Sequence, residues 1–179
     1  MSYTGIGSRN TPKDVLEDMR DLGSLFARMN LTLRSGGAPG ADTAFETGCS
    51  RILGTKEIYL PWKNFEDNPS PLHTVTRSAL ETAEKVWNMS RDSSFKYLKQ
   101  PIKLLMARNA YQIAGKTLDE PSLFVVCWTP DGCIDAAGRT KQTGGTGQAI
   151  AHASYLGIPV FNLQREHALD ELIEFVEKF

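Results

Sequence analysis

The stretch LTLRSGGAPGAD, residues 31–42, passes from one predicted element directly into the next. Residues 31–35 form a short β-prone run, and three glycines and one proline follow within residues 36–40. Residues 41–53 are then predicted as a helix. A strand that turns through glycines into a helix is the repeating unit of parallel sheets, because parallel strands need crossover connections. The stretch therefore predicts an α/β fold.

The same strand-then-helix order recurs along the chain. Further strands are predicted at residues 2–6, 57–62, 121–129 and 158–163. Further helices are predicted after the N-cap residue Thr11, at residues 12–29, and at 74–87, 102–114, 146–156 and 168–179. Residues 121–129, PSLFVVCWT, hold a continuous apolar run typical of a strand covered on both faces. We expect a three-layer Rossmann-like domain with a mainly parallel sheet of five or more strands, and with residues 123–128 and 159–163 near the sheet centre.

Bulk composition narrows the class of protein. The 179 residues are 41% hydrophobic and 23% charged, with a formal net charge of −1, as in ordinary globular domains. The length fits one domain over residues 1–179. Neither a whole-chain basic excess nor an apolar run near the roughly 20 residues that span a bilayer is present. The three cysteines lack the spacing of a zinc site or a disulfide framework, so we expect reduced thiols in a cytoplasmic protein. Because no long apolar run is present, we expect no membrane association.

Three glycine-rich segments stand out: GIGSR at residues 5–9, SGGAPGAD at 35–42 and TGGTGQAI at 143–150. Each follows a predicted strand and precedes a predicted helix, so all three fall at the carboxyl edge of a parallel sheet, where ligands bind. Glycine lets backbone N–H groups approach a ligand closely, and a helix N-terminus favours phosphate. The segments are either simple tight turns or three walls of one anion site, and their number favours the anion site.

Four motifs in this order resemble a known family. GIGSR, RSGGAPGAD, MARNAYQIAG at residues 106–115 and GGTGQAI follow one another as in the core of DNA-processing protein A. The chain resembles the Rossmann-like SLOG superfamily over about residues 3–163, and most of all its short phage and bacterial members. That superfamily also includes the lonely-guy phosphoribohydrolases. In their motif a glutamate serves catalysis, whereas the comparable stretch here has Gln148 and no following glutamate.

The resemblance and the loops together leave three functions open. The first is a binding module for a nucleotide or a nucleotide-derived signal of the ADP-ribose type. The second is an enzyme that cleaves the N-glycosidic bond of a nucleoside monophosphate. The third is single-stranded DNA binding, with phosphates contacted by the loops and by Arg34, Arg108, Arg139 and Lys141.

Individual ligand contacts follow from these interpretations. Arg9, just after the first loop, is expected to meet phosphate, and Arg108 with Asn109 matches an arginine–asparagine pair of the family. Trp128 closes the most apolar strand at the ligand edge, where its indole is expected to stack on a base. The residues expected to bind the ligand are Gly5, Gly7, Ser8, Arg9, Ser35, Gly36, Gly37, Gly40, Asp42, Arg108, Asn109, Trp128, Gly144, Gly145, Thr146 and Gly147.

Two carboxylates are the candidate catalytic groups. Glu46 lies four residues beyond Asp42, so a helix puts both side chains on one face near its N-terminus. Such a pair suits glycosidic-bond chemistry, with one carboxylate as nucleophile or stabiliser and the other as acid. The alternative roles are a helix cap or a ribose contact for Asp42 and a solvated first-turn position for Glu46.

Metal and self-association are the remaining expectations. His73, His152 and His167 are scattered without metal-ligand spacing, so we expect no metal and no cofactor. The middle helices carry Leu104, Leu105 and Tyr111, which offer more apolar surface than packing on a sheet needs. A homo-oligomer is expected on that ground.

Overall fold

The computed structural model describes residues 1–90 and 94–178, and its centre is a five-stranded sheet in which every pairing is parallel. The strand order is β3-β2-β1-β4-β5. The strands are β1 (Ser2–Gly5), β2 (Thr32–Ser35), β3 (Lys56–Ile58), β4 (Val125–Cys127) and β5 (Val160–Asn162). This all-parallel sheet with helices around it confirms the predicted Rossmann-like α/β fold.

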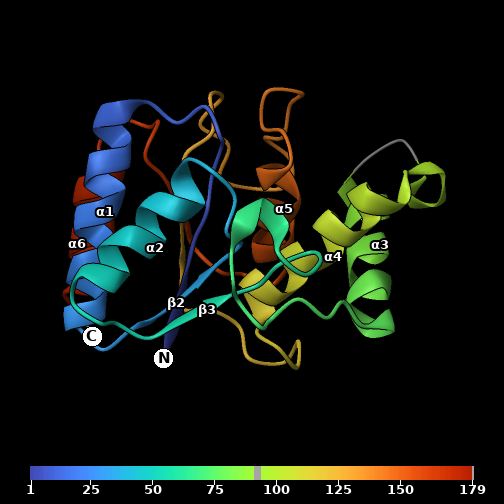
Figure 1. Ribbon diagram of the computed structural model, residues 1–179. Coiled ribbons are helices and arrows are strands. Elements are labelled where there is room, and N and C mark those ends of the chain that lie inside the picture. Colours follow the sequence, from blue (N-terminus) through green and yellow to red (C-terminus); the bar gives the residue numbers. More distant parts are fainter. Residues whose placement is uncertain (91–93, 179) are drawn as a thin grey trace.

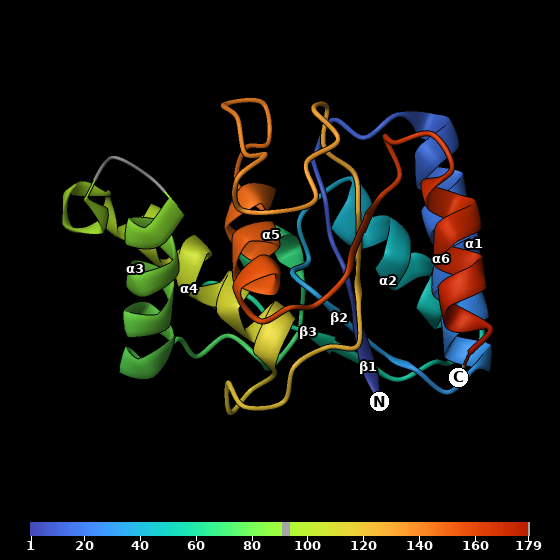
Figure 2. The same cartoon turned by 180° about the vertical axis from the view of Figure 1, so that it is seen from behind.

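Helices cover both faces of the sheet (Figures 1 and 2). One face carries α1 (Lys13–Arg28), α2 (Ala41–Arg51) and α6 (Ala168–Val176), and the other carries α4 (Gln100–Ala114) and α5 (Thr146–Tyr155). The helix α3 (Arg77–Ser90) packs on α4 and α5 rather than on the strands. Two short 3-10 turns, η1 (Phe65–Asp67) and η2 (Phe95–Tyr97), complete the described elements. No described helix is long and apolar enough to cross a membrane.

The alternation of side chains along β4 shows how the sheet serves two cores. Val126 packs in the cluster under α1, α2 and α6, whereas Val125 and Cys127 pack in the cluster under α4 and α5. The first cluster is rich in aromatic rings, with Tyr3 stacked on Phe124 at a centroid distance of 5.7 Å. Apolar residues on both faces explain why this strand has no polar alternation.

Several predicted boundaries were wrong. β3 ends at Ile58, β4 spans only Val125–Cys127, and the predicted helix at residues 74–87 runs from Arg77 to Ser90. The strand predicted near the centre at residues 159–163 is β5, which lies at an edge of the sheet. Its apolar character comes from α5 and α6, which both contact it, and not from a central position.

Two side-chain predictions also need correction. Pro12, not Thr11, precedes the first helical residue of α1, and the Thr11 hydroxyl donates to the Ser8 carbonyl at 2.8 Å. Thr11 thus fixes the first loop. Tyr111, expected on an association surface, is buried against Tyr59, and its hydroxyl bonds Thr76. Self-association remains a prediction that depends on Leu104 and Leu105, which are partly exposed.

Candidate functional site

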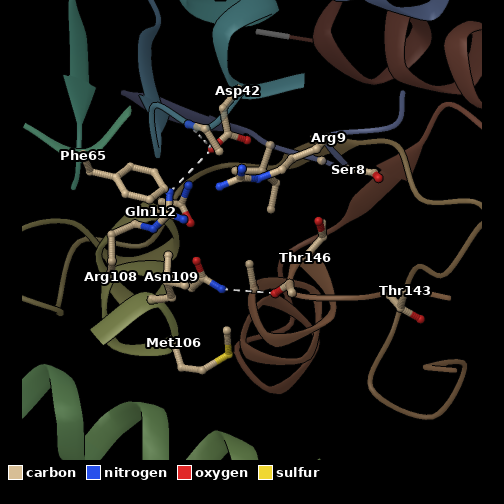
Figure 3. Close-up of a pocket in the computed structure, with 16 residues that line it drawn as sticks. Ser8, Arg9, Asp42, Phe65, Met106, Arg108, Asn109, Gln112, Thr143 and Thr146 are labelled. Atoms are coloured by element: carbon tan, nitrogen blue, oxygen red, sulfur yellow. Dashed lines mark hydrogen bonds and ion pairs between the residues drawn. The ribbon is translucent and has the colours of Figure 1, made fainter. Parts of the chain in front are cut away.

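A cavity of about 310 Å³ lies beyond the carboxyl ends of the strands. From β1 the chain continues to β2 and β3 on one side, while β4 and β5 lie on the other, and ligands of open α/β sheets bind at such a reversal. Three loops and α4 contribute the polar walls (Figure 3). These walls consist of Gly7, Ser8 and Arg9 after β1, Ala38 and Asp42 after β2, Arg108, Asn109 and Gln112 on α4, and Thr143, Gly145 and Thr146 at the start of α5.

A buried ion pair lies at one wall of the cavity. The Arg108 Nη1 atom is 3.5 Å from Asp42 Oδ2, and both side chains are more than nine-tenths buried. Burial raises the pKa of Asp42, although Arg108 and the Ala38 and Gly7 N–H groups act in the opposite direction. Burial likewise lowers the pKa of Arg108. The two pKa shifts have one cause, the loss of water around both charges. In each group, the opposite charge of the partner is the largest influence that acts against burial.

Gln112 connects this ion pair to the loops. With its carboxamide oriented to satisfy both ends, the Gln112 oxygen accepts from Gly36 N at 3.0 Å and from Arg108 Nη1 at 3.2 Å. Its nitrogen donates to Asn109 Oδ1 at 2.9 Å, and Asn109 Nδ2 donates to the Gly145 carbonyl at 3.2 Å. One hydrogen-bonded chain therefore runs from the second loop across α4 to the third loop, and Figure 3 shows its last bond, from Asn109 to Gly145.

Two glycines allow the loops to approach one another. A Cβ atom on Gly36 would lie 1.2 Å from Arg108 Nη1, so only a residue without a side chain fits beside the guanidinium. Gly40 has a φ of +91° and a Cβ there would lie 2.8 Å from the Ser8 carbonyl. The absence of a side chain at these two glycines lets the first and second loops pack against each other and against Arg108.

Arg9 supplies a second guanidinium at the cavity. Its side chain is 56% exposed and pairs with Glu66 at 2.6 Å. Arg9 also contributes to lowering the pKa of Arg108, after the larger effect of burial, because two like charges face one space. Arg9 therefore lines the cavity as one half of an ion pair, whose carboxylate comes from the segment after β3 rather than from the cavity wall.

The third loop is held by a carboxylate that pattern reasoning missed. Asp131 accepts hydrogen bonds from the Thr129 hydroxyl at 2.8 Å, the Thr140 hydroxyl at 2.6 Å and the Thr143 hydroxyl. Burial opposes ionisation, but these hydrogen bonds outweigh it and lower the pKa of Asp131 to about 2. Asp131 is therefore ionised at neutral pH, and its hydrogen bonds position Thr143 just before the start of α5.

α5 begins at the cavity wall with its positive end uncompensated. Gly145 is its N-cap, no side chain caps it, and its first turn contains no acidic residue. The helix dipole therefore favours an anion here, as it does at other exposed helix N-termini. A Cβ on Gly145 would have only Met106 Cε nearby, at 4.0 Å, which shows that the space in front of this residue is open.

The structure brings together half of the predicted ligand residues. Those that line the cavity are Gly7, Ser8, Arg9, Asp42, Arg108, Asn109, Gly145 and Thr146. The other eight do not line it: Gly5, Ser35, Gly36, Gly37, Gly40, Trp128, Gly144 and Gly147. All of these except Trp128 belong to the three glycine-rich segments. Ser35, for example, is fully buried and donates to the Gly5 carbonyl at 2.6 Å.

Trp128 is a correction to the predicted site. The residue is 7% exposed and packs in the cluster under α1, α2 and α6, so its indole is not available to stack on a base. The residue does reach the ligand edge, but through its backbone, because the Trp128 carbonyl accepts from Ser8 N at 3.0 Å. The apolar character of residues 121–129 led to the prediction of Trp128 at this edge, and the same apolar character explains why its side chain is buried.

The predicted carboxylate pair is divided. Asp42 lines the cavity, whereas Glu46 bonds Lys56 Nζ at 3.1 Å and Asn68 Nδ2 at 3.1 Å and does not line it.

Arg34 is a further correction, because it is buried and pairs with Glu57 at 2.7 Å and with Glu120 at 3.5 Å. Arg34 lines a separate cleft that also includes Met1 and Pro121, so it cannot extend a phosphate track from the loops.

Sequence reasoning also missed Phe65, Met106 and Gln112. Gln112 lies one helical turn after Arg108, and that spacing was a usable signal for a shared face. Asp131 stands in a Pro-Asp-Gly turn, which marks a structured loop. Phe65 carried no such signal, because it enters the cavity wall from an irregular segment after β3.

Comparisons of the chain with protein-family models, with curated proteins and with solved structures find no match. The resemblance to the SLOG superfamily therefore depends on the order of the four motifs alone. Within residues 1–90 and 94–178, no group of three or more His, Cys, Asp or Glu side chains is placed to hold a metal ion.

Proposed function

We propose that this protein binds a phosphate-bearing nucleotide, or a nucleotide-derived signal of the ADP-ribose type, in the cavity at the carboxyl edge of the sheet. The observation that carries the proposal is the convergence of all three glycine-rich loops on one cavity of about 310 Å³. A volume of that size is in the range of small-molecule sites, and polar groups there converge from separate elements.

The charges divide the cavity into two parts. Arg108 is neutralised by Asp42, so this wall offers directed hydrogen bonds from Asn109 and Gln112 but little net charge. The N-terminus of α5 supplies a partial positive charge, and the half-exposed Arg9 supplies a guanidinium whose partner in this structure is Glu66; both groups suit a phosphate. The apolar side chains of Ile6, Leu105 and Met106 offer a surface for the less polar part of a nucleotide.

The same contacts favour nucleotide binding over glycosidic-bond cleavage and over single-stranded DNA binding. Glycosidic-bond cleavage generally uses two carboxylates flanking the scissile bond, and Asp42 is the one acidic residue among the described cavity-lining residues. Asp42 is moreover engaged by Arg108 and by the Ala38 N–H group. DNA binding loses support because Arg34 is buried and paired with Glu57.

A ligand panel tests the proposal. AMP, ADP, ADP-ribose and a thymidine oligonucleotide are titrated by thermal shift and by calorimetry. A native-state ligand at about 100 times its Kd stabilises by about 2.7 kcal/mol, which raises the Tm by roughly 5–10 °C for a chain of this size. We expect at least one small nucleotide to do so, and the oligonucleotide not to.

Arg9→Ala should weaken that binding by about 1.5–3 kcal/mol, the scale of a charged hydrogen bond. Arg51→Ala is the matched control, because Arg51 is a similarly exposed arginine at the far end of α2. Release of free base on incubation would support the hydrolase alternative instead. Oligonucleotide binding that falls steeply with salt would support DNA binding.

A further inference from the structure

The segment from Trp62 to Asn68 forms one side of the cavity. Phe65 at its middle is 5% exposed and belongs to the cavity wall. Its ring centroid lies 5.9 Å from the Arg108 guanidinium carbon, and Figure 3 shows the ring beside Arg108 and Gln112. Outside the wall, Trp62 packs edge-on against Phe65 at a centroid distance of 5.2 Å and is 38% exposed.

Two polar contacts hold the segment from opposite sides. At its end, Asn68 Nδ2 donates to Glu46 Oε2 at 3.1 Å, which ties the segment to α2. At its tip, Glu66 pairs with Arg9 Nη2 at 2.6 Å, which ties it to the first glycine-rich loop. The second contact therefore joins the segment to the arginine that the proposed function assigns to phosphate.

The backbone of the segment is strained. Asn64, Glu66 and Asp67 have φ angles of 58°, 50° and 58°, in the left-handed region that residues with side chains seldom adopt. Such conformations persist only where surrounding contacts impose them, and they gather at switch regions and ligand clamps. The contacts that hold the tip include the Phe65 wedge and the Glu66–Arg9 pair.

We propose that residues 62–68 form a lid in which the Glu66 carboxylate occupies Arg9 until an anion of the ligand replaces it. The inference rests on the proposed function, since it assigns a regulator to the same site. Glu66 and a ligand phosphate have the same sign of charge and compete for one guanidinium. Ligand binding at Arg9 therefore releases the tip of the lid, and the left-handed turn is free to relax.

Inorganic pyrophosphate is the probe for this competition, because it carries the anion without a base or a sugar. Calorimetry compares the wild type with Glu66→Gln, which keeps the side-chain shape, and with Asp67→Asn. Asp67 is the matched control, since it has the same charge and the same left-handed backbone one residue further on. Glu66→Gln should bind pyrophosphate about two- to five-fold more tightly, the change expected from an ion pair that is partly exposed. Asp67→Asn should match the wild type.

A double-mutant cycle with Arg9→Ala separates competition from a general effect of charge. The gain from Glu66→Gln should vanish in the Arg9→Ala background, because the competed group is then missing. Equal affinity of the wild type and Glu66→Gln, an equal gain in Asp67→Asn, or no pyrophosphate binding by any variant overturns the lid. If Glu66→Gln shows the gain but no nucleotide binds, the lid stands and the nucleotide proposal fails. If a nucleotide binds and Glu66→Gln has no effect, the lid fails and the nucleotide proposal stands.

Discussion

Replacing Gly145 by valine should remove ligand binding and leave the fold intact. Gly145 has φ −68° and ψ −28°, which any residue adopts, and a Cβ there would meet only Met106 Cε at 4.0 Å. The change in folding free energy is therefore expected within about 1 kcal/mol, the scale of N-cap and propensity effects. In the complex, the valine side chain would occupy the place of an anion in front of α5.

The expected loss of affinity follows from the contacts at stake. Excluding the anion from the first turn of α5 forfeits at least one charged hydrogen bond, worth about 1.5–3 kcal/mol, or roughly ten- to hundred-fold in Kd. Calorimetry with the tightest nucleotide of the panel measures the loss, and urea unfolding measures stability. Gly138→Val is the control, because Gly138 is an exposed glycine outside the left-handed region, the nearest neighbour of a Cβ there would be Asp135 Oδ1 at 3.3 Å, and it does not line the cavity. The reasoning is refuted if Gly145→Val folds normally and binds within about two-fold of the wild type.

Three further predictions concern stability, each measured by urea unfolding. Gly36→Ala puts a Cβ 1.2 Å from Arg108 Nη1 and should destabilise by about 1–3 kcal/mol, while Gly145→Ala should not; equal stability of the two variants would contradict this. Asp42→Ala leaves the buried Arg108 guanidinium unpaired and should lose about 3–5 kcal/mol, whereas a loss under about 1 kcal/mol would mean that the pair contributes little. Burial lowers the pKa of His152 to about 4 in the folded protein. Between pH 6.5 and 4 the unfolded chain therefore binds more protons at this residue than the folded protein does. The free energy of unfolding should fall by roughly 3 kcal/mol as the pH drops through that window. His152→Gln should flatten that dependence, and an unchanged pH profile in this variant would refute the assignment.

The strand and helix content could be predicted from local pattern, but the strand order could not. A glycine-rich turn between a strand and a helix is a local signal, and it identified the units that begin at β1 and β2. An apolar strand reports that both of its faces are covered, and says nothing about how many strands lie beside it. For that reason the pattern predicts residues 159–163 at the centre, although β5 lies at an edge where α5 and α6 cover it.

For the site, the loops were predictable and their supports were not. Parallel topology places every strand-to-helix loop at one edge, so Gly7, Arg9 and Gly145 follow from the fold. Gln112 bonds Gly36 and Phe65 faces Arg108, and both contacts join segments far apart in the chain. Only the tertiary structure brings such partners together.

Amide chemical shifts measured with and without the tightest nucleotide of the panel test the central claim most directly. If one ligand contacts all three loops, the largest shifts should fall on the amides of Ser8, Ala38 and Thr146. The amides of Thr32 and Glu57, at the separate cleft lined by Arg34, should stay in place. Shifts confined to that cleft, or to only one of the three loops, would contradict a single site built by all three.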